Sequence, residues 1–181
     1  NSLPVTCEER IAYRSNQNAD GLMSGLYSYR KNMTVTLKGN GGTLDGMTEE
    51  KIVVYSEEEP LNLRNYPFTR DGYVLVGWSE DATGTTRMFG RDSFLSSQIG
   101  SGVLYAVWLK VPESGNYAIF DTCGWGEIPD PFSRVGTLCC VELTDDFKMP
   151  VLQKSSTAPE VKLWLWHNAD NWSAIYYEGE A

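Results

Sequence analysis

The sequence predicts a mainly β protein built from two small units. Short apolar runs recur along the chain, and polar gaps that contain Gly and Pro separate them, which is the pattern of strands and turns. Two of these runs, residues 73–78 and 103–108, are apolar in both alternate sets of positions, and each ends in a tryptophan. A strand that is apolar on both faces is usually an inner strand, covered from both sides.

Residues 1–32 show no sustained hydrophobic period. Residues 15–21 are of loop-forming types, and the apolar residues between glycines in 21–27 are too few for a helix. We expect a lead-in segment that packs only locally. The first residues lack the basic and apolar regions of a signal peptide, so the chain has the character of a mature or excised piece.

The first unit is predicted to begin with a half-buried strand over residues 33–38, because apolar and polar side chains alternate there. The Gly-Asn-Gly-Gly stretch 39–42 predicts a turn, since Gly and Asn tolerate positive φ. It lacks the Gly-Lys-Ser/Thr end of a phosphate-binding loop. A second strand is expected at 52–55. The glutamates and proline of 57–60 then indicate a solvated turn, favoured over a calcium loop because the carboxylates are not spaced as ligands.

Residues 73–78 form the predicted central strand of this unit. Simple alternation places Tyr73 and Leu75 on one face and Val74, Val76 and Trp78 on the other. An exposed loop follows at 81–86, and 103–108 is the predicted closing strand. Pro and Gly among polar neighbours in 111–115 predict a linker, so the first unit is assigned to residues 33–110.

The second unit, residues 116–181, is predicted to consist of strands throughout. The candidates are 117–120, 135–143, 161–166 and 174–177, with a turn at 145–146. Regular short strands with Pro- and Gly-bearing gaps favour a β-sandwich-like module.

The motifs of the first unit follow one another in the order of a known repeat. A Val-Thr-Leu strand with an Asn-Gly-Gly turn comes first, then Thr-Arg-Asp-Gly-Tyr and Gly-Trp, and finally Leu-Tyr-Ala-Val-Trp at 104–108. This order resembles the Listeria–Bacteroides repeat, also called the internalin-type B-repeat. The departures are Leu37 and Leu75 where Phe is usual, and Phe68, which stands between the proline and threonine of the motif. The resemblance implies a β-grasp-like domain of secreted or surface-attached bacterial proteins, with no catalytic residues to carry over.

The second unit is similar to a small β module found beside such repeats in secreted gut-bacterial proteins. That module carries a strand, a turn and a K-V-K-x-F-x-W segment, to which residues 161–166 correspond. Trp172 stands where Met is usual and Ala174 where Pro is usual, so this second match is the looser one.

Charge and hydropathy exclude two classes of partner. The net charge is −9 and the basic residues are scattered, whereas binding of nucleic-acid phosphates needs clustered Lys and Arg. No apolar run approaches the roughly 20 residues that span a membrane. We therefore expect no nucleic acid and no membrane insertion within this chain. An acidic, solvated surface is favoured over an acidic binding face.

The cysteines do not predict a metal or cofactor site. Cys139 and Cys140 are adjacent and should point to opposite faces of a strand, and the single histidine, His167, cannot complete a zinc site with them. Buried thiols are the favoured state. A disulfide bridge from Cys123 to Cys139 or Cys140 is the alternative.

No catalytic set emerges, so the protein is predicted not to be an enzyme. A Ser or Cys nucleophile needs a histidine base, and His167 lies in a predicted turn. Carboxylates that could hydrolyse a glycoside are present in the second unit, yet nothing in the sequence places two of them across a cleft. These carboxylates are Asp121, Glu127, Asp130, Asp145 and Asp146.

Three tryptophans are the candidate ligand contacts. Trp125 lies between glycines in a context that often exposes a ring, while Trp164 and Trp166 share one face of a predicted strand. Their two rings either form an exposed aromatic platform or are covered by another layer, and the covered state is favoured.

Together these observations predict a non-enzymatic, extracellular spacer or adhesion fragment of a bacterial cell-surface or secreted protein. Its partner would be an unidentified protein or glycan at the cell surface, and no cofactor is expected. The alternative is a carbohydrate-binding module that uses exposed tryptophans, whose flat apolar faces suit sugar rings.

Overall fold

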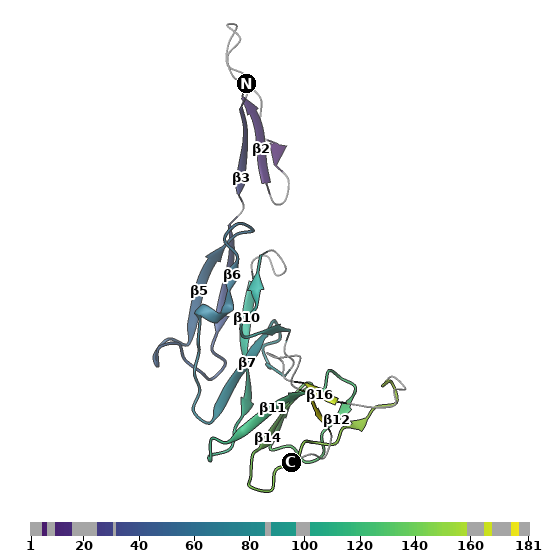
Figure 1. Ribbon diagram of the computed structural model, residues 1–181. Helices are drawn as coiled ribbons and strands as arrows, with labels where there is room; N and C mark the ends of the chain where they lie inside the picture. Colours follow the sequence, from purple (N-terminus) through teal and green to yellow (C-terminus); the bar gives the residue numbers. More distant parts are fainter. Residues whose placement is uncertain are drawn as a thin grey trace.

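The computed structural model describes residues 5–6, 10–15, 25–30, 32–85, 88–96, 102–158, 165–167 and 175–177. These residues form strands joined by turns, with one short 3-10 helix, η1 (Leu63–Asn65), and no α-helix among them (Figure 1). The predicted mainly β class is confirmed. Within the described residues, no helix has the length and apolar character needed to cross a membrane.

The N-terminal residues form a three-stranded antiparallel sheet that the sequence did not indicate. Its strands are β1 (Val5–Thr6), β2 (Arg10–Ser15) and β3 (Gly25–Arg30), in the order β1-β2-β3. The register places Tyr13 opposite Tyr27. In the described part of the chain, these strands pair only with one another.

A mixed five-stranded sheet is the centre of the molecule, and Figure 1 shows it below the N-terminal strands. Its order is β5 (Glu50–Tyr55), β4 (Met33–Lys38), β10 (Gly102–Lys110), β7 (Tyr73–Ser79) and β8 (Phe89–Gly90). The first and last long strands, β4 and β10, are parallel neighbours, and the other pairs are antiparallel. Both runs predicted to be inner strands, β7 and β10, have a strand on each side.

One face of this sheet carries the larger core. A two-stranded ladder of β6 (Leu61–Asn62) and β9 (Phe94–Leu95) contributes Leu61 and Leu95 to it. The alternation predicted for β4 is confirmed, because Met33, Val35 and Leu37 are buried in this cluster. The remaining buried members are Leu44, Tyr55, Leu63, Phe68, Trp78, Leu104, Ala106 and Trp108.

The predicted division of β7 between two faces is wrong for Trp78. Trp78 packs in the same cluster as Tyr73 and Leu75, whereas Val74 and Val76 face the opposite side. The cause is a register shift, in which Val107 of β10 pairs with Gly77 and the next residue, Trp108, pairs with Leu75. β7 therefore contains an extra residue, and such a bulge inverts the alternation beyond it.

The part of the second face formed by β7 and β10 is covered by the C-terminal unit. A three-stranded antiparallel sheet, β11 (Tyr117–Asp121), β14 (Leu138–Glu142) and β13 (Ser133–Val135), packs against it. Leu138 and Cys140 of this sheet share one buried cluster with three residues of the first unit, Val76, Val107 and Leu109. The boundary at 111–115 stays a prediction, but the chain on its two sides builds a common core.

The single strand predicted over 135–143 is confirmed only for Leu138–Glu142, because Val135 ends a separate strand and the two strands form a hairpin. Strand β13 ends at Val135 and β14 begins at Leu138, with Gly136 at φ 56° in the turn between them. Glycine adopts this left-handed conformation without the penalty that a Cβ brings. An apolar run with one interior glycine resembles a single strand in sequence, and here the glycine marks a reversal.

Two small antiparallel ladders complete the C-terminal unit. They are β12 (Gly126–Glu127) with β15 (Gln153–Lys154), and β16 (Leu165–His167) with β17 (Ile175–Tyr177). The turn predicted at 145–146 is confirmed. His167 was predicted to lie in a turn, but its backbone pairs with Ile175 at the end of β16. Residues 161–164 of the predicted strand 161–166 lie outside the described residues.

The burial predicted for the thiols is confirmed for the adjacent pair, Cys139 and Cys140, and is wrong for Cys123. Cys139 and Cys140 are buried and belong to clusters on opposite sides of β14, while Cys123 is exposed, and none of the three forms a disulfide. Burial raises the pKa of the Cys140 thiol above its ordinary value of 9.0. A buried, protonated thiol is a poor nucleophile.

Native protein treated with a thiol-specific reagent should therefore react at Cys123 and not at the adjacent pair. The measurement uses a Cys7→Ser variant, because Cys7 lies outside the described residues, and mass spectrometry of the labelled peptides. Unfolding in denaturant should expose Cys139 and Cys140 to the reagent. Rapid labelling of Cys139 in the native protein would contradict the register of β14.

Candidate functional site

The residues that carry the repeat-like motifs meet at one end of the five-stranded sheet. The indole Nε1 of Trp108 donates a hydrogen bond to the carbonyl oxygen of Gly39 over 2.7 Å, and the Asn40 amide donates to the carbonyl of Ala106 over 3.0 Å. Asn40 adopts φ 47°, as the predicted turn requires. A Cβ on Gly42 would lie 2.3 Å from the Trp108 ring, so only glycine fits at this position.

The central motif closes over the same turn. The Arg70 guanidinium lies 4.0 Å from the centre of the Tyr73 ring, and its Nη1 donates to the Asn40 carbonyl over 3.4 Å. Backbone hydrogen bonds of 2.9 and 2.8 Å join Thr43 and Thr69 in both directions. The motif residues therefore form a structural lock between the first turn, the central strand and the last strand.

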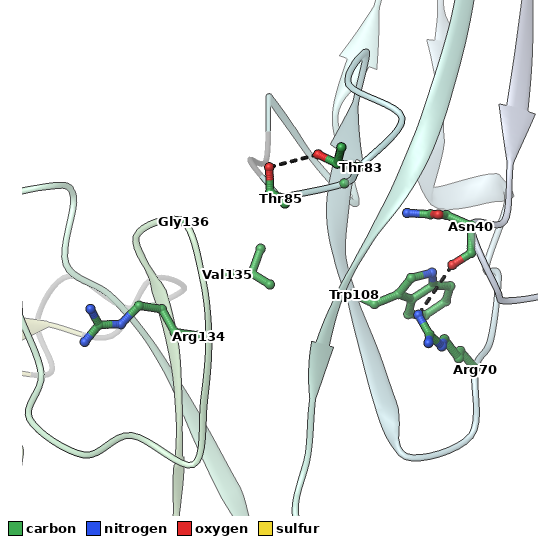
Figure 2. A pocket seen from close by; sticks show the side chains of 9 residues that line it. Asn40, Arg70, Thr83, Thr85, Trp108, Arg134, Val135 and Gly136 are labelled. Atoms are coloured by element: carbon green, nitrogen blue, oxygen red, sulfur yellow. Dashed lines mark hydrogen bonds between the residues drawn. The ribbon is translucent and has the colours of Figure 1, made fainter.

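A hollow of about 390 Å³ lies between this lock and the β13–β14 turn (Figure 2). Its volume is within the range of small-molecule sites. It is lined by Asn40, Arg70, Thr83, Gly84, Thr85, Trp108, Arg134, Val135 and Gly136. The loop over 81–85 is exposed as predicted, except that Gly84 is buried against Asn40.

The polar groups around this hollow do not converge on its centre. In Figure 2 the two arginines lie on opposite sides, and the Arg134 guanidinium points away from Val135. Arg134 forms an ion pair with Glu127 over 3.1 Å and donates to the Ile128 carbonyl over 2.9 Å. Hydrogen bonds from Thr83 lower the pKa of the exposed Asp81, with a further contribution from Thr85. The hollow therefore lies at a polar junction between the two units. The polar side chains around it already form hydrogen bonds within the protein.

A second hollow of about 250 Å³ lies within the C-terminal unit. Asp121 organises one side of it by accepting hydrogen bonds from the Thr137 hydroxyl over 2.6 Å and from the Cys123 backbone over 2.9 Å. Its lining residues are Thr122, Gly124, Gly126, Glu127, Arg134, Gly136, Thr137, Cys139 and Ser155. Two of the candidate carboxylates, Asp121 and Glu127, are thus engaged in local structure.

The three candidate tryptophans have different surroundings. Trp125 is 40% exposed. Trp166 is half-buried, lies edge-on to Phe120 with ring centres 5.0 Å apart, and donates from Nε1 to the Pro150 carbonyl over 2.7 Å. Trp164 lies outside the described residues. The structure thus gives Trp166 a packing role and leaves Trp125 as the accessible candidate.

Sequence reasoning missed two features of the first unit. Phe68, which interrupts the motif, is 3% exposed and lies edge-on to Trp78 with ring centres 5.5 Å apart. The apolar residues Ile52 and Val54 of β5 are each 62% exposed. The sequence carries no signal for the second feature, because residues 52–55 are all apolar and only the fold shows that Val53 and Tyr55 occupy the inward set.

Ligand-forming side chains are dispersed over the described residues, where no three His, Cys, Asp or Glu side chains lie close enough to share a metal ion. Comparisons of the chain with protein-family models, with curated proteins and with solved structures found no match. The resemblance to the B-repeat stays a prediction.

The two core tryptophans should respond differently to replacement by phenylalanine. Trp108→Phe removes the hydrogen bond to Gly39, whereas the buried Nε1 of Trp78 has no partner among the described residues. Trp108→Phe should therefore reduce the free energy of unfolding by about 1 kcal/mol more than Trp78→Phe does. Urea denaturation of both variants measures this difference. Equal losses would contradict the lock at Gly39.

Proposed function

We propose that this chain is a non-enzymatic spacer or adhesion part of a bacterial cell-surface or secreted protein. The observation that carries the proposal is the parallel pairing of β4 with β10. The chain enters the central sheet at Met33 and leaves it at Lys110. Because Gly102 is paired with Val35, these two points are separated by about ten strand residues, or roughly 30 Å.

This connectivity suits a spacer for two reasons. A unit whose chain enters and leaves at opposite ends of one sheet extends a tandem array by its own length. In addition, tension applied at those ends acts along β4 and β10, so the hydrogen bonds of their ladder share the load instead of opening one at a time.

The arrangement of strands supports the β-grasp-like architecture that the resemblance implies. The strand order is second, first, last, third among the four long strands, with the first and last parallel at the centre. The hallmark residues of the motif, including Asn40 and Trp108, make internal hydrogen bonds and so support a structural purpose for the motif.

The experiment that tests the proposal uses cells that produce the whole protein. An antibody against residues 33–158 should label intact cells without permeabilisation. In the spacer role, replacing residues 33–158 by an unrelated β unit of similar length should preserve adhesion, while deleting them should weaken it. Labelling only after permeabilisation would contradict the surface location, and an equal loss in both variants would contradict the spacer role.

Carbohydrate binding is the second candidate, and it rests on the exposed ring of Trp125. An accessible indole can stack on the apolar face of a sugar. A glycan array probed with the whole chain tests this function, with Trp125→Ala as the control. Binding that survives this substitution would assign the sugar contact to another part of the surface.

A further inference from the structure

The edge strand β5 combines unpaired backbone with exposed apolar side chains. It ends the five-stranded sheet, and no described strand pairs with its outer side, which lies on the left of Figure 1. The hydrogen bond from the Gly39 backbone to the Glu49 carbonyl, 2.7 Å long, fixes the phase of its ladder with β4. By alternation, Lys51, Val53 and Tyr55 direct their backbone groups to β4, and Ile52 and Val54 direct theirs outward.

The side chains of the same two residues are also accessible. Ile52 and Val54 are each 62% exposed and lie beside Thr36 and Thr34 of β4. Val103 of β10 continues this surface next to Thr36. We call these five residues the β5 patch. Along β10 the patch is continuous with Val107 and Leu109, which the C-terminal unit covers.

Most natural edge strands are protected against further pairing. Common devices are a proline, a bulge, a very short strand or charged side chains. The charged residues of β5, Glu50 and Lys51, stand at its start, and residues 52–55 carry no charge. β5 has six residues, its register with β4 is continuous over all of them, and none is proline. An edge of this kind is suited to accept an additional strand, because main-chain hydrogen bonds give affinity and alternate side chains give selectivity.

The charges around β5 decide which kind of strand fits. Residues 49–59 contain five glutamates and one lysine, and Glu50 forms an ion pair with Lys38 of β4 over 3.2 Å, so the segment keeps an excess of negative charge. If two copies of the chain paired antiparallel through β5, residues 49–50 of one copy would lie beside 57–59 of the other, and carboxylates would face carboxylates. Like charges at these positions disfavour self-association.

We propose that β5 binds an extended segment of a partner protein, apolar at alternate positions and flanked by Lys or Arg. The added strand forms hydrogen bonds with the outward backbone groups of Ile52 and Val54. Its apolar side chains cover the β5 patch, and its basic flanks lie beside Glu49–Glu50 and Glu57–Glu59. This binding goes beyond the spacer function and does not depend on it.

The test uses the whole chain and a labelled peptide probe, Lys-Lys-Thr-Val-Thr-Ile-Thr-Val-Lys-Lys, in a fluorescence anisotropy titration. The control peptide has the same centre with Glu in place of every Lys. The basic-flanked peptide should bind, more weakly as salt increases, and the control should bind at least about tenfold more weakly. Absence of binding by the basic-flanked peptide up to about 1 mM would overturn the proposal.

Two variants at one position separate the backbone contribution from the side-chain contribution. Val54→Pro removes an outward N–H without removing a hydrogen bond to β4, and it should weaken peptide binding at least about tenfold. Val54→Thr keeps the N–H and should weaken binding less. Circular dichroism and melting curves verify that both variants fold. If Val54→Pro leaves peptide binding unchanged, the peptide binds elsewhere on the protein. If the chain forms a concentration-dependent dimer that Val54→Pro abolishes, the edge binds a second copy of the chain. Either result overturns the proposal.

Discussion

Replacing Trp78 by alanine should lower the free energy of unfolding by roughly 3–5 kcal/mol, the range for removal of a large aromatic ring from a core. The Trp78 side chain is fully buried and packs edge-on against Phe68. Because natural domains are stable by only about 5–15 kcal/mol, a loss of this size removes a large part of the total.

Urea denaturation measures the loss, and Trp125→Ala is the matched control because the same ring is removed from an exposed position. The control should change stability by less than about 1 kcal/mol. A loss below about 1 kcal/mol for Trp78→Ala would contradict its place in the core.

A fragment limited to the first unit should be strongly destabilised. The sequence predicts that residues 33–110 fold without help from the rest, but Val107 and Leu109 are fully buried in a cluster completed by Leu138 and Cys140. Removing the C-terminal unit exposes these residues together with Val76. The loss is about 1.5–3 kcal/mol for each large side chain that returns to water.

Thermal unfolding of a 32–112 fragment, followed by circular dichroism, tests this expectation. The fragment should melt at a lower temperature than the whole chain, and less cooperatively. Leu109→Ala in the whole chain should produce an intermediate effect of about 2–5 kcal/mol. A fragment that melts cooperatively at the temperature of the whole chain would show that the first unit is independent.

The strands of the first unit were predictable because local patterns determine them. Alternation in 33–38 and the continuous apolar runs at 73–78 and 103–108 each reflect the burial of that segment alone. The bulge that brings Trp78 to the face of Leu75 was not predictable, since it depends on pairing with β10, which is distant in the sequence.

The shared core and the binding edge are also products of tertiary structure. Cys140 and Val107 each look like ordinary core residues, and only the packing of β14 on β10 shows that they belong to the same cluster. For β5 the sequence shows an apolar run at 52–55, but its position at the sheet edge follows from the order of all five strands. The indole of Trp166 was a ligand candidate by pattern, and its hydrogen bond to Pro150 appears only in the fold.

In a spacer of this connectivity, load passes through the parallel ladder of β4 and β10. Single-molecule force spectroscopy of the whole chain tests it with two pairs of attachment points. Attachment at Asn32 and Glu113 loads the ladder along its strands, whereas attachment at Asp45 and Glu113 peels β4 from β10 starting at one end. The unfolding force should be clearly higher for the first pair, because its hydrogen bonds must break together. Equal forces for the two pairs would contradict this path of the load.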